Sequence, residues 1–388
     1  MNPFSIYFPQ FYPTPTNDRA WGQGFTDWAL VAQANLYDRW SRRAPRRGFY
    51  DGSDPAVHFS QTAEMRAAGL AGMGVYHYWF YTHQELPAFE QTLLGTPQQN
   101  DFPWFLIWAS ESWSRRWIGD PSPIVSLAKV PEQADIETHC RYLLKCFDHP
   151  AYFRWQDKPL FVWYHLDHFS DPHRVVEQYR ETMRRHGVEI AVGQFLKNTF
   201  EFRHSGLTDL SYLFEPRLYF GTRRAGRGSR SKAVMETVER LLGEHTARRL
   251  LTLVDRVQQK GHTYPADDFL EYLRSDERAR LVASLSGVIQ EVISPGWNNT
   301  PRYDARFTAL QDVPTEQFGE LTRSAAARVA SLPPLINAWN EWSEGAAVEP
   351  CAYYGTRYLD ALTRAGAVAP CEEEPSQGAR VSSEFSKP

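Results

Sequence analysis

The sequence contains few cysteines and has no strong excess of charge of either sign. Only four of its 388 residues are cysteine. None forms a C-x-x-C pair, so neither a zinc knuckle nor a disulfide framework is indicated. The 42 Lys and Arg residues nearly balance the 46 Asp and Glu residues, which leaves a formal net charge of −4. Because nucleic-acid binding needs a basic surface, this balance argues against nucleic acid as the main partner.

Long apolar runs are also missing from the chain. No run approaches the ~20 residues that a membrane-spanning helix requires, so we expect no integral membrane segment. The first residues, Met-Asn-Pro-Phe-Ser-Ile-Tyr-Phe, lack a basic region and are typical of a strand rather than a signal peptide. Together with the few cysteines, this predicts a cytoplasmic protein whose thiols are free.

Several motifs of well-known enzyme classes are absent. The chain has no Walker loop, no G-x-S-x-G turn and no H-E-x-x-H pair. It also has no D-x-D triplet, the acidic pair with which many glycosyltransferases hold a nucleotide diphosphate through a metal ion. The carboxylates are scattered without metal-ligand spacing, so we expect no metal and no cofactor.

Aromatic residues, in contrast, are abundant. They make up 14% of the chain and include 13 Trp and 19 Tyr. A large core accounts for part of this number. Clefts that bind sugars account for it as well, because sugar rings stack on aromatic faces.

Short apolar runs recur along the chain and predict buried parallel strands. They cover residues 4–8, 74–80, 104–109, 160–164, 190–195, 210–214, 288–293 and 335–339. Helix-like segments lie between them at residues 60–68, 131–147, 172–186 and 316–331. Eight such strands with intervening helices predict a single (β/α)8 TIM-type barrel. A doubly wound sheet is the alternative, but no G-x-G-x-x-G follows the first strand.

Two regions interrupt this alternation. Residues 219–286 begin with a basic stretch (residues 221–230) and continue as a helical pattern, which predicts an insertion between strands six and seven. Residues 371–388 are rich in Glu, Ser and Pro, and we expect this tail to be disordered. One barrel domain over residues 1–370 follows from this reading.

The densest chemical signal is Asn337-Ala-Trp-Asn-Glu-Trp-Ser-Glu-Gly345, directly after the last apolar run. The carboxyl ends of barrel strands carry the active site in this fold. Glu341 and Glu344 are therefore candidates for the two carboxyls of acetal hydrolysis, one protonated and one ionised. Neighbouring Trp rings would raise one of the two pKa values by desolvation.

Other predicted strand ends carry polar and aromatic residues too. Trp108-Ala-Ser-Glu-Ser-Trp-Ser-Arg-Arg-Trp117 follows strand three and combines carboxylate, guanidinium and indole groups, which suit sugar hydroxyls and sugar faces. His77 and Trp79 end strand two, His165 ends strand four, Glu215 follows strand six, and Trp297 and Asn298 follow strand seven. Several such ends on one rim predict one shared sugar-binding cleft.

Several segments, taken in order, resemble the WbsX-type proteins, which are glycoside hydrolase family 99-like proteins of bacterial polysaccharide clusters. These segments are residues 7–13 (Tyr-Phe-Pro-Gln-Phe-Tyr-Pro), 21–28, 76–80, 110–117, 295–300 and 337–345. Family 99 implies a (β/α)8 barrel that acts on α-mannosyl linkages with retention. By position, the resemblance implies that Glu341 assists the sugar 2-hydroxyl as base. It also implies that Glu344 is the acid/base at the glycosidic oxygen.

The motifs and the strand ends together give the residues that we expect to contact sugar. They are Tyr7, His77, Trp79, Glu111, Trp113, Arg115, His165, Glu215, Trp297, Asn298, Asn340 and Trp342. The sequence departs from the family pattern at Ser112, where the family usually has Asn, and at Asn298, where Asp is common. Both departures concern which sugar is bound more than the reaction.

The sequence thus predicts a retaining glycoside hydrolase or transglycosylase acting on an oligosaccharide or polysaccharide. A glycosyltransferase is the alternative, because the basic stretch 221–230 could hold the phosphate of an activated sugar. A third class is a carbohydrate-binding protein whose glutamates only bind hydroxyls.

Overall fold

The protein folds into a closed barrel of eight parallel strands. The computed structural model describes residues 1–34, 44–115, 120, 122–223, 261–303 and 306–366. The barrel strands are β1 (Phe4–Tyr7), β2 (Gly72–Trp79), β4 (Trp104–Trp108), β8 (Lys158–Trp163), β9 (Ala191–Leu196), β10 (Leu210–Phe214), β12 (Val288–Ile293) and β15 (Leu335–Ile336). Each pairs with the next in parallel, and β1 pairs with both β2 and β15, which closes the ring.

All eight strands coincide with the apolar runs of the sequence, and the TIM-type fold is confirmed. The strands read as continuous apolar runs because their side chains are buried on both sides. One set fills the barrel and the other lies under the surrounding helices. β4, for example, has all five residues buried.

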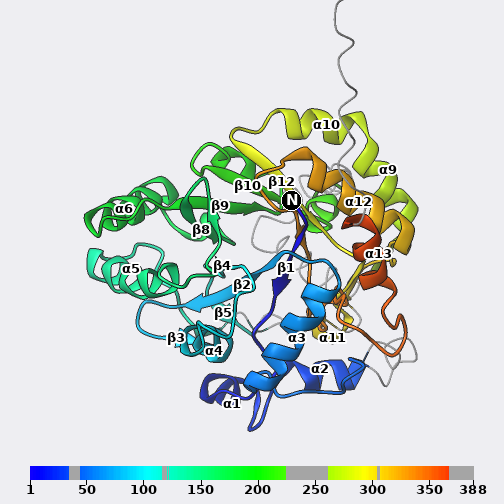
Figure 1. Ribbon diagram of the computed structural model, residues 1–388, viewed down its shortest axis with the longest axis horizontal. Coiled ribbons are helices and arrows are strands. Elements are labelled where there is room, and N and C mark those ends of the chain that lie inside the picture. The colour runs from blue at the N-terminus through cyan, green and yellow to red at the C-terminus, as the bar shows by residue number, and fades with distance from the viewer. Residues whose placement is uncertain (35–43, 116–119, 121, 224–260, 304–305, 367–388) are drawn as a thin grey trace, which may run out of the picture.

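Helices surround the barrel (Figure 1). In chain order they are α3 (Pro55–Ala67), α4 (Ala88–Gly95), α5 (Gln133–Phe147), α6 (Pro172–Arg185), α9 (Ala266–Arg274), α10 (Asp276–Ala283), α12 (Thr315–Arg328) and α13 (Arg357–Gly366). Local signals set their starts. Asp171 caps α6 by accepting a hydrogen bond from the Arg174 amide, and Pro172 occupies the first turn, where a missing amide proton costs nothing.

One unit of the barrel departs from the regular alternation. Between β9 and β10 the chain forms only a short 3-10 turn, Glu201–His204, in place of a full helix. The short strands β3 (Gln84–Glu85) and β7 (Arg154–Trp155) pair in antiparallel fashion with β2 and β8 respectively.

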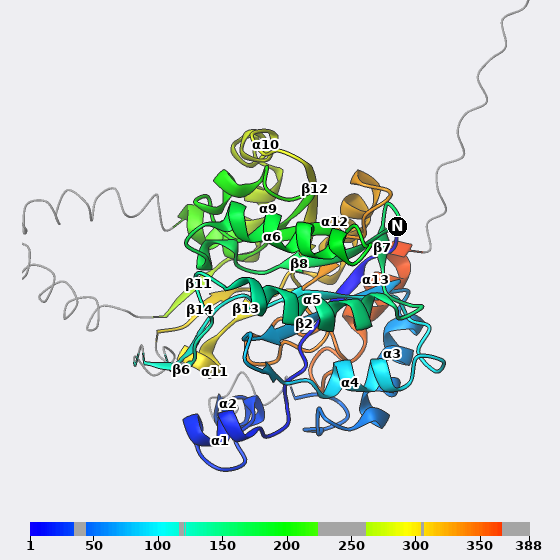
Figure 2. The ribbon, with the colours of Figure 1, turned by 90° about the vertical axis from the view of Figure 1, so that its left-hand side faces the viewer.

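Additional short elements gather at the carboxyl ends of the barrel strands. They are α1 (Pro15–Trp21), α2 (Asp27–Ala34), β5 (Trp113–Ser114), β6 (Pro123–Val125), β11 (His262–Tyr264), β13 (Trp297–Asn298), α11 (Thr300–Tyr303) and β14 (Thr308–Leu310). Figure 2 shows β6, β11, β13, β14 and α11 on the side away from the N-terminus. These elements build the walls above the barrel mouth.

The predicted insertion between strands six and seven is seen in part. Its described portion contains β11, α9 and α10, whereas residues 224–260, with most of the basic stretch, lie outside the described residues. The predicted tail 371–388 lies outside them as well. Within the described ranges, no helix has the length and apolarity to cross a membrane.

Candidate active site

Two side chains of the Trp-Asn-Glu-Trp segment after β15, Asn340 and Trp342, hold this segment in place. Asn340 is fully buried and binds the backbone of Phe8 twice, accepting from its amide at 2.8 Å and donating to its carbonyl at 2.9 Å. The Trp342 indole donates to buried Glu349 at 3.0 Å. Because these two side chains fix the segment to the residue that follows β1 and to the core, Glu341 and Glu344 face the barrel mouth.

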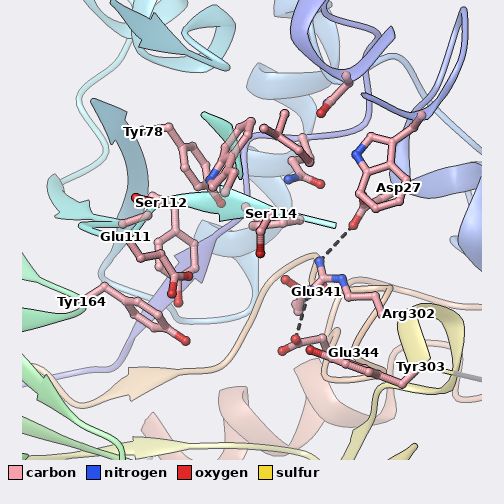
Figure 3. A pocket seen from close by; sticks show the side chains of 18 of the residues that line it. Asp27, Tyr78, Glu111, Ser112, Ser114, Tyr164, Arg302, Tyr303, Glu341 and Glu344 are labelled. Atoms are coloured by element: carbon pink, nitrogen blue, oxygen red, sulfur yellow. Dashed lines mark hydrogen bonds and ion pairs between the residues drawn. The ribbon is translucent and has the colours of Figure 1, made fainter. Parts of the chain in front are cut away.

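Glu341 and Glu344 line one cavity of about 290 Å³ at the carboxyl end of the barrel, which we call the glutamate cavity (Figure 3). Its walls come from β2 and β10, from the segments that follow β1, β4, β8 and β15, and from α1, α2 and α11. The aromatic part of the wall includes Phe8, Tyr76, Tyr78, Trp113, Tyr164 and Phe214. Its polar part includes Asp27, Glu111, Arg217, Arg302, Glu341 and Glu344.

Arg302 of α11 joins the two glutamates. Its Nη1 lies 2.7 Å from Glu344 Oε1, and its Nη2 lies 3.3 Å from Glu341 Oε1. Nη2 also lies 2.9 Å from Asp27 Oδ2 of α2, and Asp27 accepts a further hydrogen bond from Ser343 at 2.7 Å. Figure 3 shows this guanidinium between Asp27 and the glutamates. The contacts bring α2, α11 and the segment after β15 together.

The two glutamates differ in their surroundings. The Glu341 side chain is 8% exposed and that of Glu344 is 16% exposed. Burial raises the pKa of Glu341 to about 8, while Arg302 opposes the shift and Glu344 adds to it. A carboxyl that keeps its proton near neutral pH is therefore present beside one that forms a close ion pair with arginine.

A second, larger cavity of about 890 Å³ adjoins the first, and we call it the side cavity. Glu111, Tyr164, Arg217 and Tyr303 line both. In the side cavity, the Lys197 ammonium lies 3.2 Å from the Glu201 carboxylate. Although burial opposes it, this charge lowers the pKa of Glu201 to about 2. Because these four shared residues line both, the two cavities lie side by side at the barrel mouth.

The structure brings part of the predicted set together. Glu111, Trp113, Glu341 and Glu344 line the glutamate cavity, and Glu111 also faces the side cavity. His165 and Trp297 line the side cavity only. Trp297 is 3% exposed, and the Arg217 guanidinium lies 5.9 Å from its ring centroid.

Three predicted residues of β1 and β2 point away from both cavities. Tyr7 donates a hydrogen bond to Gln61 of α3. His77 contacts Glu90 of α4 and His139 of α5, and the Trp79 ring stacks on His139 at 4.9 Å. Successive strand side chains point to opposite faces, so the neighbours of these residues face the mouth instead.

Glu215 also lies outside the cavities, beneath the helices. Its carboxylate lies 3.3 Å from buried Arg278 of α10, and the backbone amide of Tyr219 donates to it at 3.0 Å. Burial raises the pKa of Glu215 to about 7. It is one residue beyond Phe214, which lines the glutamate cavity.

Four further predicted residues line neither cavity. Arg115 pairs with Asp120 at 3.3 Å, and the Asn298 side chain accepts hydrogen bonds from Thr300. Asn340 and Trp342 hold the glutamate segment in place, as described above. Their contacts are with protein.

Sequence reasoning missed several residues of the glutamate cavity, and for some a signal was present. Tyr76 and Tyr78 alternate with His77 and Trp79 along β2. Only one of these two pairs can face the cavity, and the sequence alone did not show that it is the tyrosine pair. Arg302 lies four residues after Asn298, just beyond the family-like segment 295–300. Asp27 belongs to a matched motif, but nothing in the sequence showed that it meets Glu341 through Arg302.

Within the described part of the chain, no group of three or more His, Cys, Asp or Glu side chains is arranged to hold a metal ion.

Comparisons with solved structures agree with the architecture. The fold matches the GH99 endo-alpha-mannosidase from Bacteroides thetaiotaomicron with a TM-score of 0.54 at 15% identity, over 93% of this chain and 95% of that one. It also matches a glycoside hydrolase-like protein with a TM-score of 0.51 at 14% identity, over 95% of both chains. At these identities the likeness shows a GH99-like barrel.

Sequence comparisons define the family. The chain is 29% identical over 384 residues to the uncharacterized protein WxcX of Xanthomonas campestris pv. campestris, strain B100, and equally so to that of strain ATCC 33913 over 386 residues. These matches cover 94% of this chain but span about half the length of the relatives. The family described as glycosyltransferase WbsX matches residues 3–362. With this match over nearly its whole length, the chain belongs to the WbsX family.

Proposed function

We propose that this protein is a retaining glycoside hydrolase, or a transglycosylase with the same glutamates. Its substrate would be an α-mannosyl-like linkage of a bacterial polysaccharide or its precursor. The observation that carries the proposal is the pairing of Glu341 and Glu344 on one cavity wall, through Arg302, at the end of the barrel where this fold carries its chemistry. The likeness to an endo-alpha-mannosidase suggests the linkage.

In the proposed reaction the substrate supplies its own nucleophile. Glu341 takes the proton of the sugar 2-hydroxyl, and O2 attacks C1 while the C1–O bond to the leaving group breaks. Glu344 gives its proton to the leaving oxygen. The product is a 1,2-anhydro sugar, which water or another sugar hydroxyl opens at C1, so that two inversions give retention.

The test compares substrates with poor and good leaving groups. Glu344→Gln should lower turnover of an α-mannobioside by ~10²–10⁴, the usual loss on removing a general acid. It should largely spare the first step on α-mannobiosyl fluoride, because fluoride needs little protonation to leave. Glu341→Gln should lower both rates, since the attacking oxygen must be activated in either case. The control is Glu189→Gln, an exposed glutamate paired with Lys158. Wild-type rates in both glutamine variants on a verified substrate would refute the proposal.

A glycosyltransferase is the second candidate, and the description of the matching family favours it. A transferase should bind a nucleotide sugar or lipid-phosphate sugar, whereas a hydrolase should turn over oligosaccharides. Separate titrations with GDP-mannose and with α-mannobiose, followed by calorimetry and product analysis, distinguish the two. Cys140, Cys146 and Cys351 are buried free thiols, and on this basis we also propose a cytoplasmic location.

A further inference from the structure

Arg302 faces more negative charge than it can neutralise. Its guanidinium contacts Asp27, Glu341 and Glu344, and its side chain is only 8% exposed. In the described part of the chain, no other Lys or Arg lies within 4.0 Å of either glutamate. Three ionised carboxylates around one cation would leave two uncompensated negative charges in a buried site. Like charges this close favour retention of a proton by one of the carboxyls.

The contacts indicate which carboxyl holds that proton. Glu344 makes the shorter contact with Arg302, at 2.7 Å, and is the more exposed of the two glutamates. Asp27 accepts hydrogen bonds from both Arg302 and Ser343. Glu341 has the longest contact with the guanidinium, at 3.3 Å, and the more buried side chain of the two glutamates.

The remaining charged and titratable groups around the site do not change this ranking. Tyr76 and Tyr78 of β2 face the glutamates, and burial raises the pKa of both phenols, so they stay neutral. The other groups around the site are Glu111 after β4, Tyr164 after β8, Arg217 after β10 and Tyr303 of α11. Among these, Arg217 carries a positive charge that interacts with Glu344.

We propose that Arg302 is a positioning residue that assigns one proton to Glu341 and keeps Glu344 ionised in the protein without substrate. The raised pKa of Glu341 agrees with this assignment. The location of the proton does not depend on the proposed function. The role of this proton in catalysis does rest on the proposed function.

If the proposed reaction is correct, this is the acid–base state of its second half. Glu344 accepts the proton of the incoming water or sugar hydroxyl as that oxygen bonds to C1. The C1–O2 bond of the 1,2-anhydro sugar breaks, and O2 takes the proton of Glu341. Afterwards Glu344 is protonated and Glu341 is ionised, which is the state that the first half needs. Arg302 therefore stabilises the protonation state of the intermediate. After the product leaves, the proton returns from Glu344 to Glu341, so the next substrate must bring it back to Glu344 before the first half begins.

Neutron diffraction from deuterium-exchanged crystals near neutral pD tests the assignment without any substrate. We expect one deuteron on a Glu341 carboxyl oxygen and none on Glu344. A deuteron on Glu344, or on neither glutamate, would overturn the proposal.

A second arm tests the role of Arg302 by infrared spectroscopy of the protonated-carboxyl band. Arg302→Met should add a protonated carboxyl at neutral pH, because Glu344 loses its cation, and the addition should disappear in Arg302→Met combined with Glu344→Gln. Arg66→Met is the control, since this arginine pairs with exposed Asp101 at the protein surface, away from the glutamates, and it should add no band. An Arg302→Met spectrum identical to wild type would contradict the role.

Near-UV circular dichroism shows whether Arg302→Met is folded. If it is not, Arg302→Lys keeps the charge but loses the two-pronged contact, and its neutron structure should show the deuteron shared with or shifted to Glu344. An unshifted deuteron on Glu341 would mean that Arg302 geometry does not make the assignment. Failure to find a cleaved oligosaccharide would refute the proposed function and leave the proton location standing.

Discussion

At the scale of single residues, two tryptophans of similar sequence context have different roles. The Trp113 side chain is half-buried and lines the glutamate cavity, where its indole lies near Tyr78 and Phe80. Trp79 is buried between the barrel and α5, stacked on His139. Both were expected to bind sugar from sequence, because each follows an apolar run beside polar residues.

These two tryptophans form a matched pair for mutation. Trp113→Ala should weaken oligosaccharide binding by about tenfold, because an aromatic contact contributes ~0.5–1.5 kcal/mol beyond area burial, and should change the melting temperature little. Trp79→Ala should lower the free energy of unfolding by ~3–5 kcal/mol, as large core truncations do. Calorimetric titration and urea unfolding measure the two effects. A large loss of stability in Trp113→Ala with unchanged binding would make Trp113 a packing residue.

At the scale of strands and helices, the sequence predicts where a strand lies in the chain better than it predicts which way the side chains of that strand point. All eight barrel strands were found from apolar runs, because strands buried on both faces have no polar positions to hide the pattern. The same property conceals which face each residue takes. Tyr7, His77 and Trp79 point toward the surrounding helices. The alternate residues Phe8, Tyr76 and Tyr78 point toward the barrel mouth. Because apolar and polar residues do not alternate along these strands, the sequence does not show which side chains point toward the barrel mouth.

The glutamate pair was predictable for a different reason. Glu341 and Glu344 follow β15. Residues after the carboxyl end of a barrel strand lie at the barrel mouth, whichever way the side chains within the strand point. Arg302 was not predictable, because its approach to the glutamates depends on α11, a short helix of a loop with no apolar run of its own.

The residues between β2, α5 and α6 should make stability depend on pH. His139 of α5 contacts His77 of β2 at 3.0 Å and Tyr179 of α6 at 2.7 Å. Burial, with a further contribution from His77, lowers the pKa of His139 well below its usual range. The unfolded chain binds a proton at this residue below about pH 6.5, and the folded protein does not. Stability from this source is therefore complete above that pH and decreases as the pH falls.

Urea unfolding at several pH values measures this effect. One such histidine contributes a slope of up to ~1.4 kcal/mol per pH unit, and buried His58, whose pKa is also lowered, adds in the same direction. His139→Gln should reduce the slope, whereas His173→Gln, at an exposed position of α6, should not. An unchanged slope in His139→Gln would mean that His139 titrates normally in the folded state.

At the scale of the whole molecule, the closure of the barrel brings the residues of the site together. β1 pairs with β15, so the first and last strands of the barrel are neighbours, and the segment after β15 reaches Phe8 and α2 directly. Residues far apart in the sequence, such as Asp27, Arg302 and Glu344, meet at one point only because the ring is closed. The chemistry of the site therefore depends on the integrity of the complete barrel.

The last helix is part of that integrity. α13 buries Tyr358, Leu359 and Leu362, and the Tyr358 ring packs edge-on against Phe318 of α12 at 5.1 Å. The Tyr358 hydroxyl lies 2.9 Å from the carbonyl oxygen of Val313. Burying a large side chain contributes ~1.5–3 kcal/mol, so three together are comparable with the ~5–15 kcal/mol by which a typical domain is stable.

We therefore expect the two ends of α13 to differ sharply as points of truncation. A chain ending at residue 366 keeps the helix and should melt at the temperature of the full chain. A chain ending at residue 355 loses the helix, leaves Phe318 without its aromatic partner, and should melt far lower or fail to fold. Thermal unfolding followed by circular dichroism distinguishes the two. Equal melting temperatures for the two truncated chains would show that the barrel closes without α13, and that the contacts of Tyr358 contribute little to its stability.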